Sequence, residues 1–211
     1  MKIKNKRIQV IVAHLDDEMF GMGGTLIKLS NPKLKNKIEV ISVCHGFGGM
    51  DENRITNFFT VLETLGIDGK VIGFDDVSLG KIDDLEINSY LEEEINEFNP
   101  DIIFTHTDKD IHIDHQVISK GVSVASRRSK CSIIHFSIPG NTEYSHNTFN
   151  PNLFIDISKE SVKKVSLLKY YKLYKKNDPL NLHKIKIRDD YYGSLIHTKS
   201  AEAFEIKRSI I

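Results

Sequence analysis

Blocks of apolar residues alternate with polar clusters along the first thirty residues of this chain. An apolar, largely β-branched run from Ile8 to Val12 predicts a buried strand, and it ends abruptly in a cluster of histidine and carboxylates. From Glu18 to Leu29, apolar residues recur at helical spacing, which predicts a helix directly after that cluster. The polar cluster therefore lies between the carboxyl end of a strand and the start of a helix, where open α/β sheets place their ligand crevices.

The same alternation continues through most of the chain. Further strands are predicted over 37–44, 70–74, 101–105, 132–138 and 153–157, and further helices over 53–65, 87–98, 116–125 and 160–174. Strands that alternate with helices predict a Rossmann-like α/β fold, a three-layer α/β/α sandwich around a mostly parallel sheet. The tail, 201–211, is predicted to add an edge strand. With five prolines and no low-complexity tract, residues 1–211 are expected to form a single domain.

Composition narrows the classes of function. Lys plus Arg and Asp plus Glu both total 29, and no basic stripe points to a nucleic-acid partner. The apolar run behind the basic N-terminus is too short for a signal peptide or a membrane span. Cys44 and Cys131 lie in apolar, strand-like runs, so we expect buried free thiols and a cytoplasmic protein. The dinucleotide glycine fingerprint is absent, so a Rossmann-like layout does not imply NAD here.

The first polar cluster offers metal ligands. His14 and Asp17 are a nitrogen and an oxygen donor three residues apart, and catalytic zinc commonly takes three protein ligands and leaves a position for water. Asp16, between them, could act as a base on that water. An ordinary helix N-cap, in which an aspartate accepts backbone N–H bonds, is an equally good interpretation of these residues alone.

A second cluster, Thr105 to His115, follows the strand predicted over 101–105. If that strand lies near the first in a parallel sheet, His115 could complete a site with His14 and Asp17. This ligand set suits Zn²⁺, although Fe²⁺ or Co²⁺ would also fit, and structural zinc would be expected to use cysteines.

Other residues of the second cluster could take part in the chemistry. His112 is the best candidate for an acid or an oxyanion-stabilising group, with Asp114 to orient it and keep its imidazolium charged, although a solvated polar turn remains the alternative. His106 could support the site or be a satisfied strand-end histidine. No ligand role is predicted for the scattered histidines His45, His135, His146, His183 and His197.

Two motifs in this order resemble one known family. The segment AHLDDEMFGMGG, Ala13 to Gly24, and the segment HIDH, His112 to His115, are similar to the paired motifs of the PIG-L/LmbE family of metal-dependent N-deacetylases. The tail Ala201-Glu202-Ala203-Phe204 is similar to the family's A-E-A-F element, which extends the resemblance over nearly the whole chain.

The resemblance implies a Rossmann-like deacetylase that removes acetyl from an N-acetylamino sugar. It implies that the metal ligands are His14, Asp17 and His115 and that Asp16 is the general base. It also implies that His112, with Asp114 as its partner, stabilises the oxyanion or protonates the amine, and that Arg54 contacts the substrate. Two departures stand out. Leu15 replaces the family's usual proline, and Asn57 stands where a glutamate often follows the arginine, so Arg54 could equally be a helix-surface residue.

Three other functions are alternatives to the deacetylase: a metal-dependent amidase or esterase acting on a non-sugar acyl group, a binding module with a relic metal site, and a nucleotide-binding domain. The complete set of ligand and catalytic residues argues against the relic, and the absent glycine fingerprint argues against the nucleotide-binding domain. We expect a small-molecule N-acetyl sugar of the N-acetylglucosamine type, nucleotide-linked or in a glycoconjugate, as substrate. Neither nucleic acid nor a membrane is expected as a partner, and homo-oligomer formation is left open.

Overall fold

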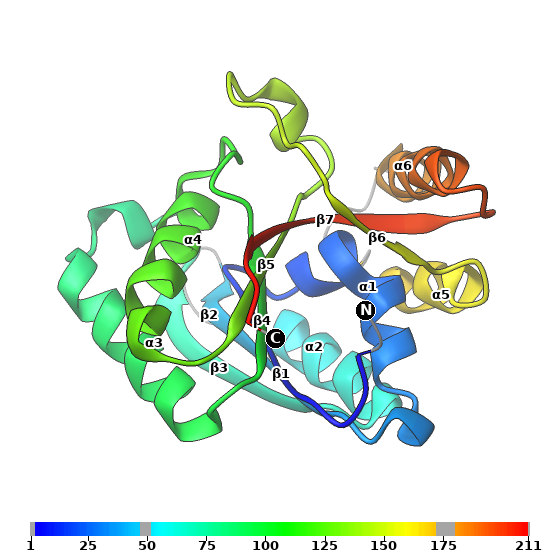
Figure 1. The fold of residues 1–211 in the computed structure, drawn as a ribbon. Helices are drawn as coiled ribbons and strands as arrows, with labels where there is room; N and C mark the ends of the chain where they lie inside the picture. The colour runs from blue at the N-terminus through cyan, green and yellow to red at the C-terminus, as the bar shows by residue number, and fades with distance from the viewer. Residues whose placement is uncertain (1–2, 47–51, 172–179, 211) are drawn as a thin grey trace.

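A computed structural model describes residues 3–46, 52–171 and 180–210 of the chain. One sheet organises them (Figure 1). Its strands are β1 (Arg7–Val12), β2 (Lys37–Gly46), β3 (Asp68–Asp75), β4 (Ile102–His106), β5 (Ser132–Phe136), β6 (Leu153–Asp156) and β7 (Ala201–Arg208). The helices are α1 (Asp17–Leu29), α2 (Glu52–Leu65), α3 (Asp84–Phe98), α4 (Ile113–Ala125), α5 (Ser161–Tyr171) and α6 (Leu180–Leu195), with short 3₁₀ turns at Pro32–Leu34, Leu79–Lys81, Ser126–Arg128 and Thr142–Tyr144.

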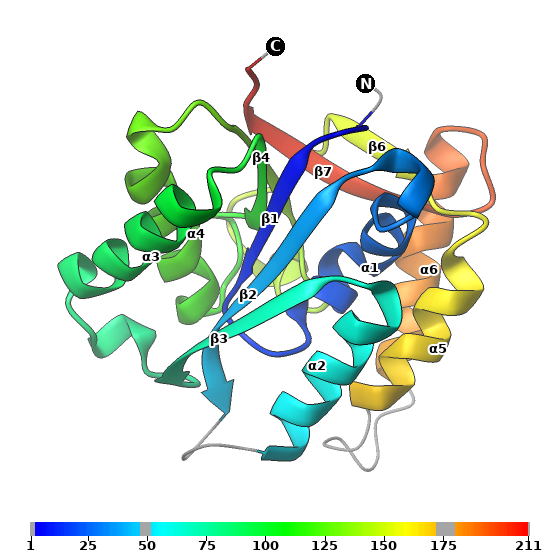
Figure 2. The same cartoon turned by 90° about the horizontal axis from the view of Figure 1, so that it is seen from below.

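The seven strands lie in the order β3-β2-β1-β4-β5-β7-β6. The first five in this order pair in parallel, whereas β7 runs antiparallel to both β5 and β6. Helices α1, α2, α5 and α6 cover one face, and α3 and α4 cover the other (Figures 1 and 2). The predicted three-layer α/β/α sandwich with a mostly parallel sheet is therefore confirmed.

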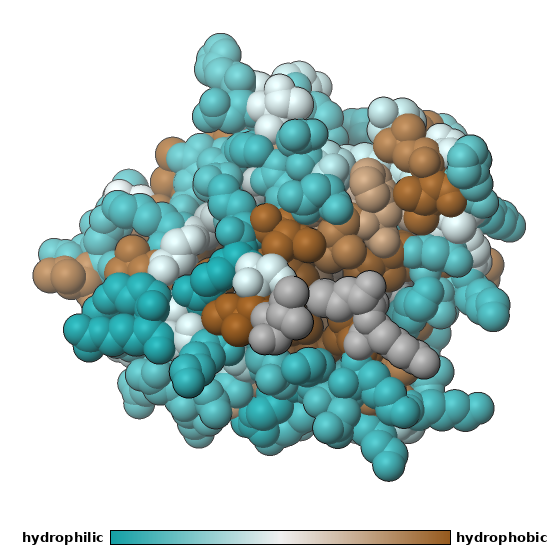
Figure 3. Space-filling view, viewed as in Figure 1, coloured by the Kyte–Doolittle hydropathy of each residue, from teal (hydrophilic) through white to brown (hydrophobic). Residues whose placement is uncertain are grey.

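The core lies on both faces of the sheet, which explains why β1 carries apolar residues on both of its faces, with Arg7 and Gln9 as its two polar residues. Ile8, Val10 and Val12 pack into the larger cluster, which also holds apolar residues of α1, α2 and α5. Ile11 packs on the opposite face with residues of α3 and α4. A central parallel strand buries both faces in this way, so its sequence does not alternate. Hydrophilic side chains cover most of the face seen in Figure 3, and apolar residues gather near its centre.

Two glycines of α1 let the helix pack closely on its neighbours. A Cβ atom added to Gly21 would lie 2.2 Å from Cδ2 of Phe136, and one added to Gly24 would lie 2.6 Å from Cδ1 of Ile157. Both distances are far shorter than van der Waals contact, so side chains at these positions would push the helix away from β5 and from the segment after β6.

Helix α1 is not continuous, and the tail of the chain stabilises its break. Met22 has non-helical dihedral angles, φ −146° and ψ 24°. Just beyond it, the carboxylate of Glu202 accepts hydrogen bonds from the backbone nitrogens of Gly24, at 2.8 Å, and Thr25, at 2.6 Å. Lys164 balances this buried charge with its Nζ atom 2.7 Å from Oε1 of Glu202. Strand β7 thus fixes the helix that begins beside the first polar cluster.

The structure corrects three predicted elements. Strand β7 is not at the edge of the sheet, since it pairs on both sides and buries all of residues 201–205. Two glutamates in this segment, Glu202 and Glu205, are typical of a half-exposed edge strand, but both are buried here. Helix α6 was not predicted, because its apolar residues do not gather on one side. Helix α4 begins at Ile113, three residues earlier than expected, with His112 as its N-cap.

Most other predicted elements lie within a few residues of their observed bounds. Residues 47–51, between the strand predicted over 37–44 and the helix predicted over 53–65, and the end of the helix predicted over 160–174 lie outside the described residues. Cys44 and Cys131 are buried free thiols, as predicted. Among the described helices, none combines the length and apolar character that crossing a bilayer requires.

Candidate metal and catalytic site

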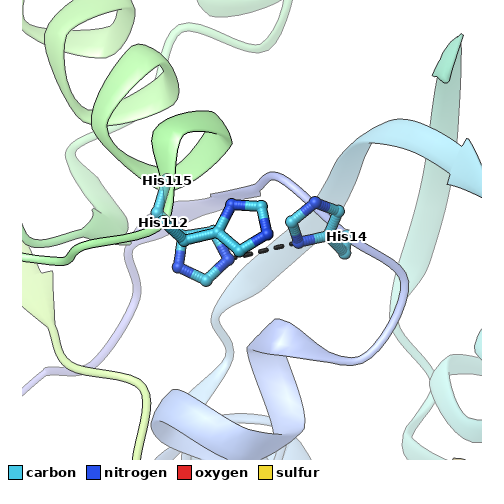
Figure 4. Close-up of side chains that lie close together, drawn as sticks. All are labelled: His14, His112 and His115. Atoms are coloured by element: carbon cyan, nitrogen blue, oxygen red, sulfur yellow. Dashed lines mark hydrogen bonds between the residues drawn. The ribbon is translucent and has the colours of Figure 1, made fainter. Parts of the chain in front are cut away.

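The two polar clusters meet at one rim of the sheet. Strands β1 and β4 are parallel neighbours, with Ile11 opposite Thr105, so their carboxyl ends deliver both clusters to the same place. The chain passes from β1 to β2 on one side and places β4 on the other, so this rim is the topological switch point, where α/β sheets bind ligands. Figure 4 shows His14, from the turn before α1, facing His112 and His115 at the start of α4.

Three donor atoms converge at the centre of this rim. Nδ1 of His14 lies 3.1 Å from Oδ2 of Asp17 and 3.2 Å from Nε2 of His115. The third side of the triangle, between Nε2 of His115 and Oδ2 of Asp17, measures 3.3 Å. All three side chains are buried. The structure therefore brings together the three residues that the sequence predicted as ligands.

Buried carboxylates hold the far nitrogens of both imidazoles. Nε2 of His14 lies 3.1 Å from Oδ2 of Asp114, and Nδ1 of His115 lies 2.8 Å from Oδ2 of Asp110. Such contacts fix the ring orientation and tautomer of histidines that ligate metals, and they increase ligand basicity. Each ring is thus held so that its remaining nitrogen points at Asp17.

The charges of this cluster are tightly linked. Burial alone would lower the pKa of His14, but the Asp17 charge and hydrogen bonds to Asp114 and Asp17 raise it to about 10. The pKa of His115 rises to about 9 for the same reason, against its burial, through Asp17 and Asp110. Burial would raise the pKa of Asp17, but His115, His14 and His106 hold it well below its usual range. The cluster therefore attracts positive charge strongly.

A divalent metal ion fits this donor set. An ion bound tetrahedrally at about 2.0–2.1 Å holds its ligand atoms roughly 3.3–3.4 Å apart, close to the triangle observed here. Two imidazole nitrogens 3.2 Å apart cannot both point protons at each other, whereas a single cation satisfies both nitrogens and the carboxylate oxygen. Two overlapping donor groups, His14-His112-His115 and Asp17-His106-His115, also have all their donor atoms within 4.8 Å of one another.

Asp16 and Arg54 lie beside the donor triangle. Asp16 occupies the N-cap position of α1, but its side chain makes no capping hydrogen bond, so its carboxylate does not serve as the helix cap that the sequence left open. Oδ1 of Asp16 lies 3.9 Å from Nη2 of Arg54, whose Nη1 atom lies 2.6 Å from Oδ2 of Asp76. Arg54, near the start of α2, is thus already paired with carboxylates at the site.

His112 lies at the more open side of the site, and its surroundings differ from the prediction. The backbone nitrogen of Asp114 donates to Nδ1 of His112, at 3.2 Å, which leaves the proton of the neutral ring on Nε2. Burial and the charges of His115 and His14 lower the pKa of His112. We expected Asp114 to orient His112 and keep it charged. Instead its carboxylate holds His14, and the lowered pKa of His112 favours the neutral ring.

The loop after β3 anchors Asp114 as well. Its Oδ2 atom accepts a hydrogen bond from the backbone nitrogen of Val77, at 2.6 Å, and its Oδ1 atom accepts one from Leu79, at 3.2 Å. Asp114 therefore links this loop, α4 and His14.

The sequence alone predicted no role for Asp110 or Asp76, and for His106 it left two alternatives, a support of the site or a satisfied strand-end histidine. Asp110 holds His115 and also accepts from the backbone nitrogen of His112, at 2.8 Å. His106 stacks on the ring of His115 with a centroid distance of 4.0 Å, and its Nε2 atom accepts from the backbone nitrogen of Ala13. His106 therefore holds the ring of His115 and the backbone after β1 in place. The position of Asp110 five residues before His115, in a loop at a strand end, was the only available signal.

Solved structures share this fold across nearly the whole chain. A conserved protein, TT1542, from Thermus thermophilus is 20% identical with a TM-score of 0.79, over 97% of this chain and 96% of its own. GalB, the 4-carboxy-2-hydroxymuconate hydratase from Pseudomonas putida KT2440, is 15% identical with a TM-score of 0.80, over 98% of both chains. The N,N'-diacetylchitobiose deacetylase from Pyrococcus horikoshii is 19% identical with a TM-score of 0.71, over 96% of this chain and 84% of its own.

At these identities the likeness establishes the fold alone, and a search of curated proteins found no match. The sequence itself carries the family assignment. A family model described as PIG-L, GlcNAc-PI de-N-acetylase, matches residues 9–126, more than half of the chain, and includes both polar clusters. The chain therefore belongs to the PIG-L family of metal-dependent de-N-acetylases and is a hydrolase of the deacetylase type.

Proposed function

We propose that this protein hydrolyses the acetamide of an N-acetylamino sugar to a free amine and acetate, using a zinc ion held by His14, Asp17 and His115. One observation carries the proposal. Both imidazoles are anchored through their far nitrogens by buried carboxylates, and their near nitrogens converge on Asp17. That arrangement is typical of a metal centre whose ligands are held by a surrounding set of acids. Fe²⁺ or Co²⁺ would suit the same donors.

A divalent ion bound here would polarise the acetyl carbonyl and lower the pKa of a water molecule. The residues around it divide the remaining work. Asp16, beside the donor triangle and not used as a cap, takes a proton from the attacking water. His112, neutral and protonated on Nε2, donates a hydrogen bond to the oxyanion that develops on the carbonyl oxygen. Asp16 then returns this proton to the nitrogen as the carbon–nitrogen bond breaks, and acetate and the free amine leave.

The substrate-binding role of Arg54 belongs to the same proposal. Its guanidinium is held between Asp76 and Asp16, so it also sets the position and charge of the proposed base. A guanidinium has five N–H donors, so Arg54 can contact substrate while it stays paired with these carboxylates.

The sugar class rests on family membership, because the fold alone also carries a hydratase. The family description concerns an N-acetylglucosamine conjugate, and one structural relative is a chitobiose deacetylase. Both involve N-acetylglucosamine units, which supports a substrate of that type. A single domain over 1–211, a cytoplasmic location and independence from nucleic acid remain predictions from the sequence, and homo-oligomer formation remains open.

The test separates the base from the ligands. Asp16→Asn keeps the size of the side chain and removes its basicity, so turnover should fall about 10²–10⁴-fold while bound metal is retained. Glu93→Gln, at an exposed position on α3, is a matched control that should leave turnover unchanged. Wild-type turnover in Asp16→Asn with full metal content would remove Asp16 from the reaction.

A further inference from the structure

A second cluster of metal-ligating side chains lies away from the site described above, on β5, β7 and the loop after β4. His135 on β5 is directly opposite Glu205 on β7 and Thr105 on β4. Directly opposite residues of neighbouring strands point their side chains to the same face of the sheet. Asp108, two residues beyond the end of β4, completes the group, and one donor atom from each of the three residues lies within 4.8 Å of the others.

The buried imidazole at the centre of this cluster has no hydrogen-bond partner among the residues that the structure describes. His135 is 1% exposed, and neither Nδ1 nor Nε2 bonds to any residue in 3–46, 52–171 or 180–210. Buried polar side-chain atoms are normally hydrogen-bonded, so an imidazole with two unpaired nitrogens requires an explanation. An ion bound to one of them would supply the partner that the described part of the chain does not provide.

The protonation state of His135 suits a metal ligand. Burial lowers its pKa to about 4, and the positive charge of Lys207 adds to this effect against the opposing charge of Asp108. The ring is therefore neutral at neutral pH and keeps a lone pair on one nitrogen. Metals bind this neutral form of histidine.

Two carboxylates flank the imidazole and are each balanced by a lysine. Nζ of Lys109 lies 2.6 Å from Oε1 of Glu205, and Nζ of Lys207 lies 2.9 Å from Oδ2 of Asp108. The backbone nitrogen of Asn150 donates to the same Oε1 atom, at 2.5 Å. Each carboxylate still has a second oxygen to offer. Both lysine side chains are partly exposed, at 25% and 38%, so they can turn toward solvent when a cation arrives.

Access to the cluster is open on one side. The side chain of Asp108 is 52% exposed, whereas His135 and Glu205 are buried. An ion can therefore reach the buried donors past Asp108. One imidazole nitrogen and two carboxylate oxygens form a set that suits Zn²⁺ and neighbouring divalent ions.

We propose that Asp108, His135 and Glu205 form a second divalent-metal site, separate from the His14-Asp17-His115 centre. It shares no ligand with that centre, and it does not depend on the proposed deacetylase reaction. The two sites are nevertheless connected, because the loop that carries Asp108 also carries Asp110, which holds His115. An ion at the second site would stabilise this loop and so the position of His115.

The test counts metal ions. The metal-free chain is dialysed against buffered Zn²⁺, and the bound metal is measured by elemental analysis. The wild-type chain should bind about two ions, and His135→Gln and Glu205→Gln should each bind about one. His146→Gln, which alters an exposed histidine of the same region of the chain, should still bind as many as wild type. Two substitutions at different strands guard against the failure of one variant to fold, which circular dichroism would reveal.

A second comparison identifies which ion is lost. In a His115→Ala background, the remaining ion should disappear on adding His135→Gln. Co²⁺ in place of Zn²⁺ should show a second set of visible absorption bands that is absent from His135→Gln. A wild-type chain that binds a single ion, or folded His135→Gln and Glu205→Gln chains that keep the wild-type count, would overturn the proposal. A wild-type chain without deacetylase activity would still be expected to bind the second ion, so failure of the proposed function and failure of this proposal give different results.

Discussion

Asp110 provides a quantitative test of how the surrounding acids support the metal ligands. Its Oδ2 atom lies 2.8 Å from Nδ1 of His115, and both side chains are almost completely buried, at 0% and 2% exposure. Asp110→Asn keeps the shape of the side chain and removes its charge. Loss of such a carboxylate behind a ligating histidine typically costs about 10–100-fold in metal affinity, or roughly 1.4–2.7 kcal/mol.

The loss of metal affinity in Asp110→Asn should depend on pH, because the pKa of His115 decides how strongly protons compete with the metal. Asp110 helps to raise the pKa of His115 to about 9, so below that pH a proton competes with the metal for the ring. At about pH 7 this competition weakens wild-type binding by roughly 100-fold for this ligand alone. Asp110→Asn lowers the pKa of His115 and relieves part of the competition. The affinity loss should therefore be largest above pH 9 and smaller near pH 7.

The assay is competition for Zn²⁺ with a chromophoric chelator at about pH 7 and about pH 9.5, carried out in a His135→Gln background so that only the first centre is titrated. Asp84→Asn is the control, because Asp84 is an exposed residue at the start of α3 that pairs with Lys120 and not with any residue of the metal centre. Wild-type affinity in Asp110→Asn at both pH values would refute the supporting role of this carboxylate. A loss that is greater near pH 7 would refute the argument from proton competition.

Two further predictions concern stability. Burial raises the pKa of Glu18 to about 8 from 4.5, so the folded metal-free chain keeps a proton that the unfolded chain releases. Glu18 alone should lower the free energy of unfolding by at most about 4–5 kcal/mol as pH rises through that interval, and urea titrations should show the fall in Glu18→Gln to be smaller than in wild type by that amount. Gly24→Ala should cost about 1–3 kcal/mol, because its Cβ atom would lie 2.6 Å from Ile157. An unchanged melting temperature in Gly24→Ala would contradict the packing described for α1.

The strand ends that carry the motifs could be predicted from the sequence, because a buried strand followed by clustered His and Asp leaves few alternatives. The parallel pairing of β1 with β4 then placed His14, Asp17 and His115 together, as expected. Such placement depends on the order of strands, which the sequence did not predict. The alternation of strands and helices predicted a mostly parallel sheet, and the neighbouring position of the first and fourth strands was a condition of the argument that the structure meets.

Contacts between distant side chains could not be predicted in the same way. Asp114 holds His14 across the site and not His112, its near neighbour in sequence, because the first turn of α4 points its side chain toward β1. The internal position of β7 could not be predicted either, because it also depends on a contact between distant side chains. Glu202 looks solvent-exposed until Lys164, 38 residues earlier in the chain, is found to neutralise it.

The most direct test of the account is acetate release from a panel of N-acetyl sugars, free, nucleotide-linked and in glycoconjugates, by metal-loaded and chelated protein. We predict that at least one N-acetylglucosamine-type compound yields equal amounts of acetate and free amine, that chelation abolishes the reaction, and that Zn²⁺ restores it. A hydratase on this fold would add water without releasing acetate. Stoichiometric metal at the His14-Asp17-His115 centre without acetate release from any sugar would contradict the proposed substrate class, and release that survives complete removal of metal would contradict the mechanism.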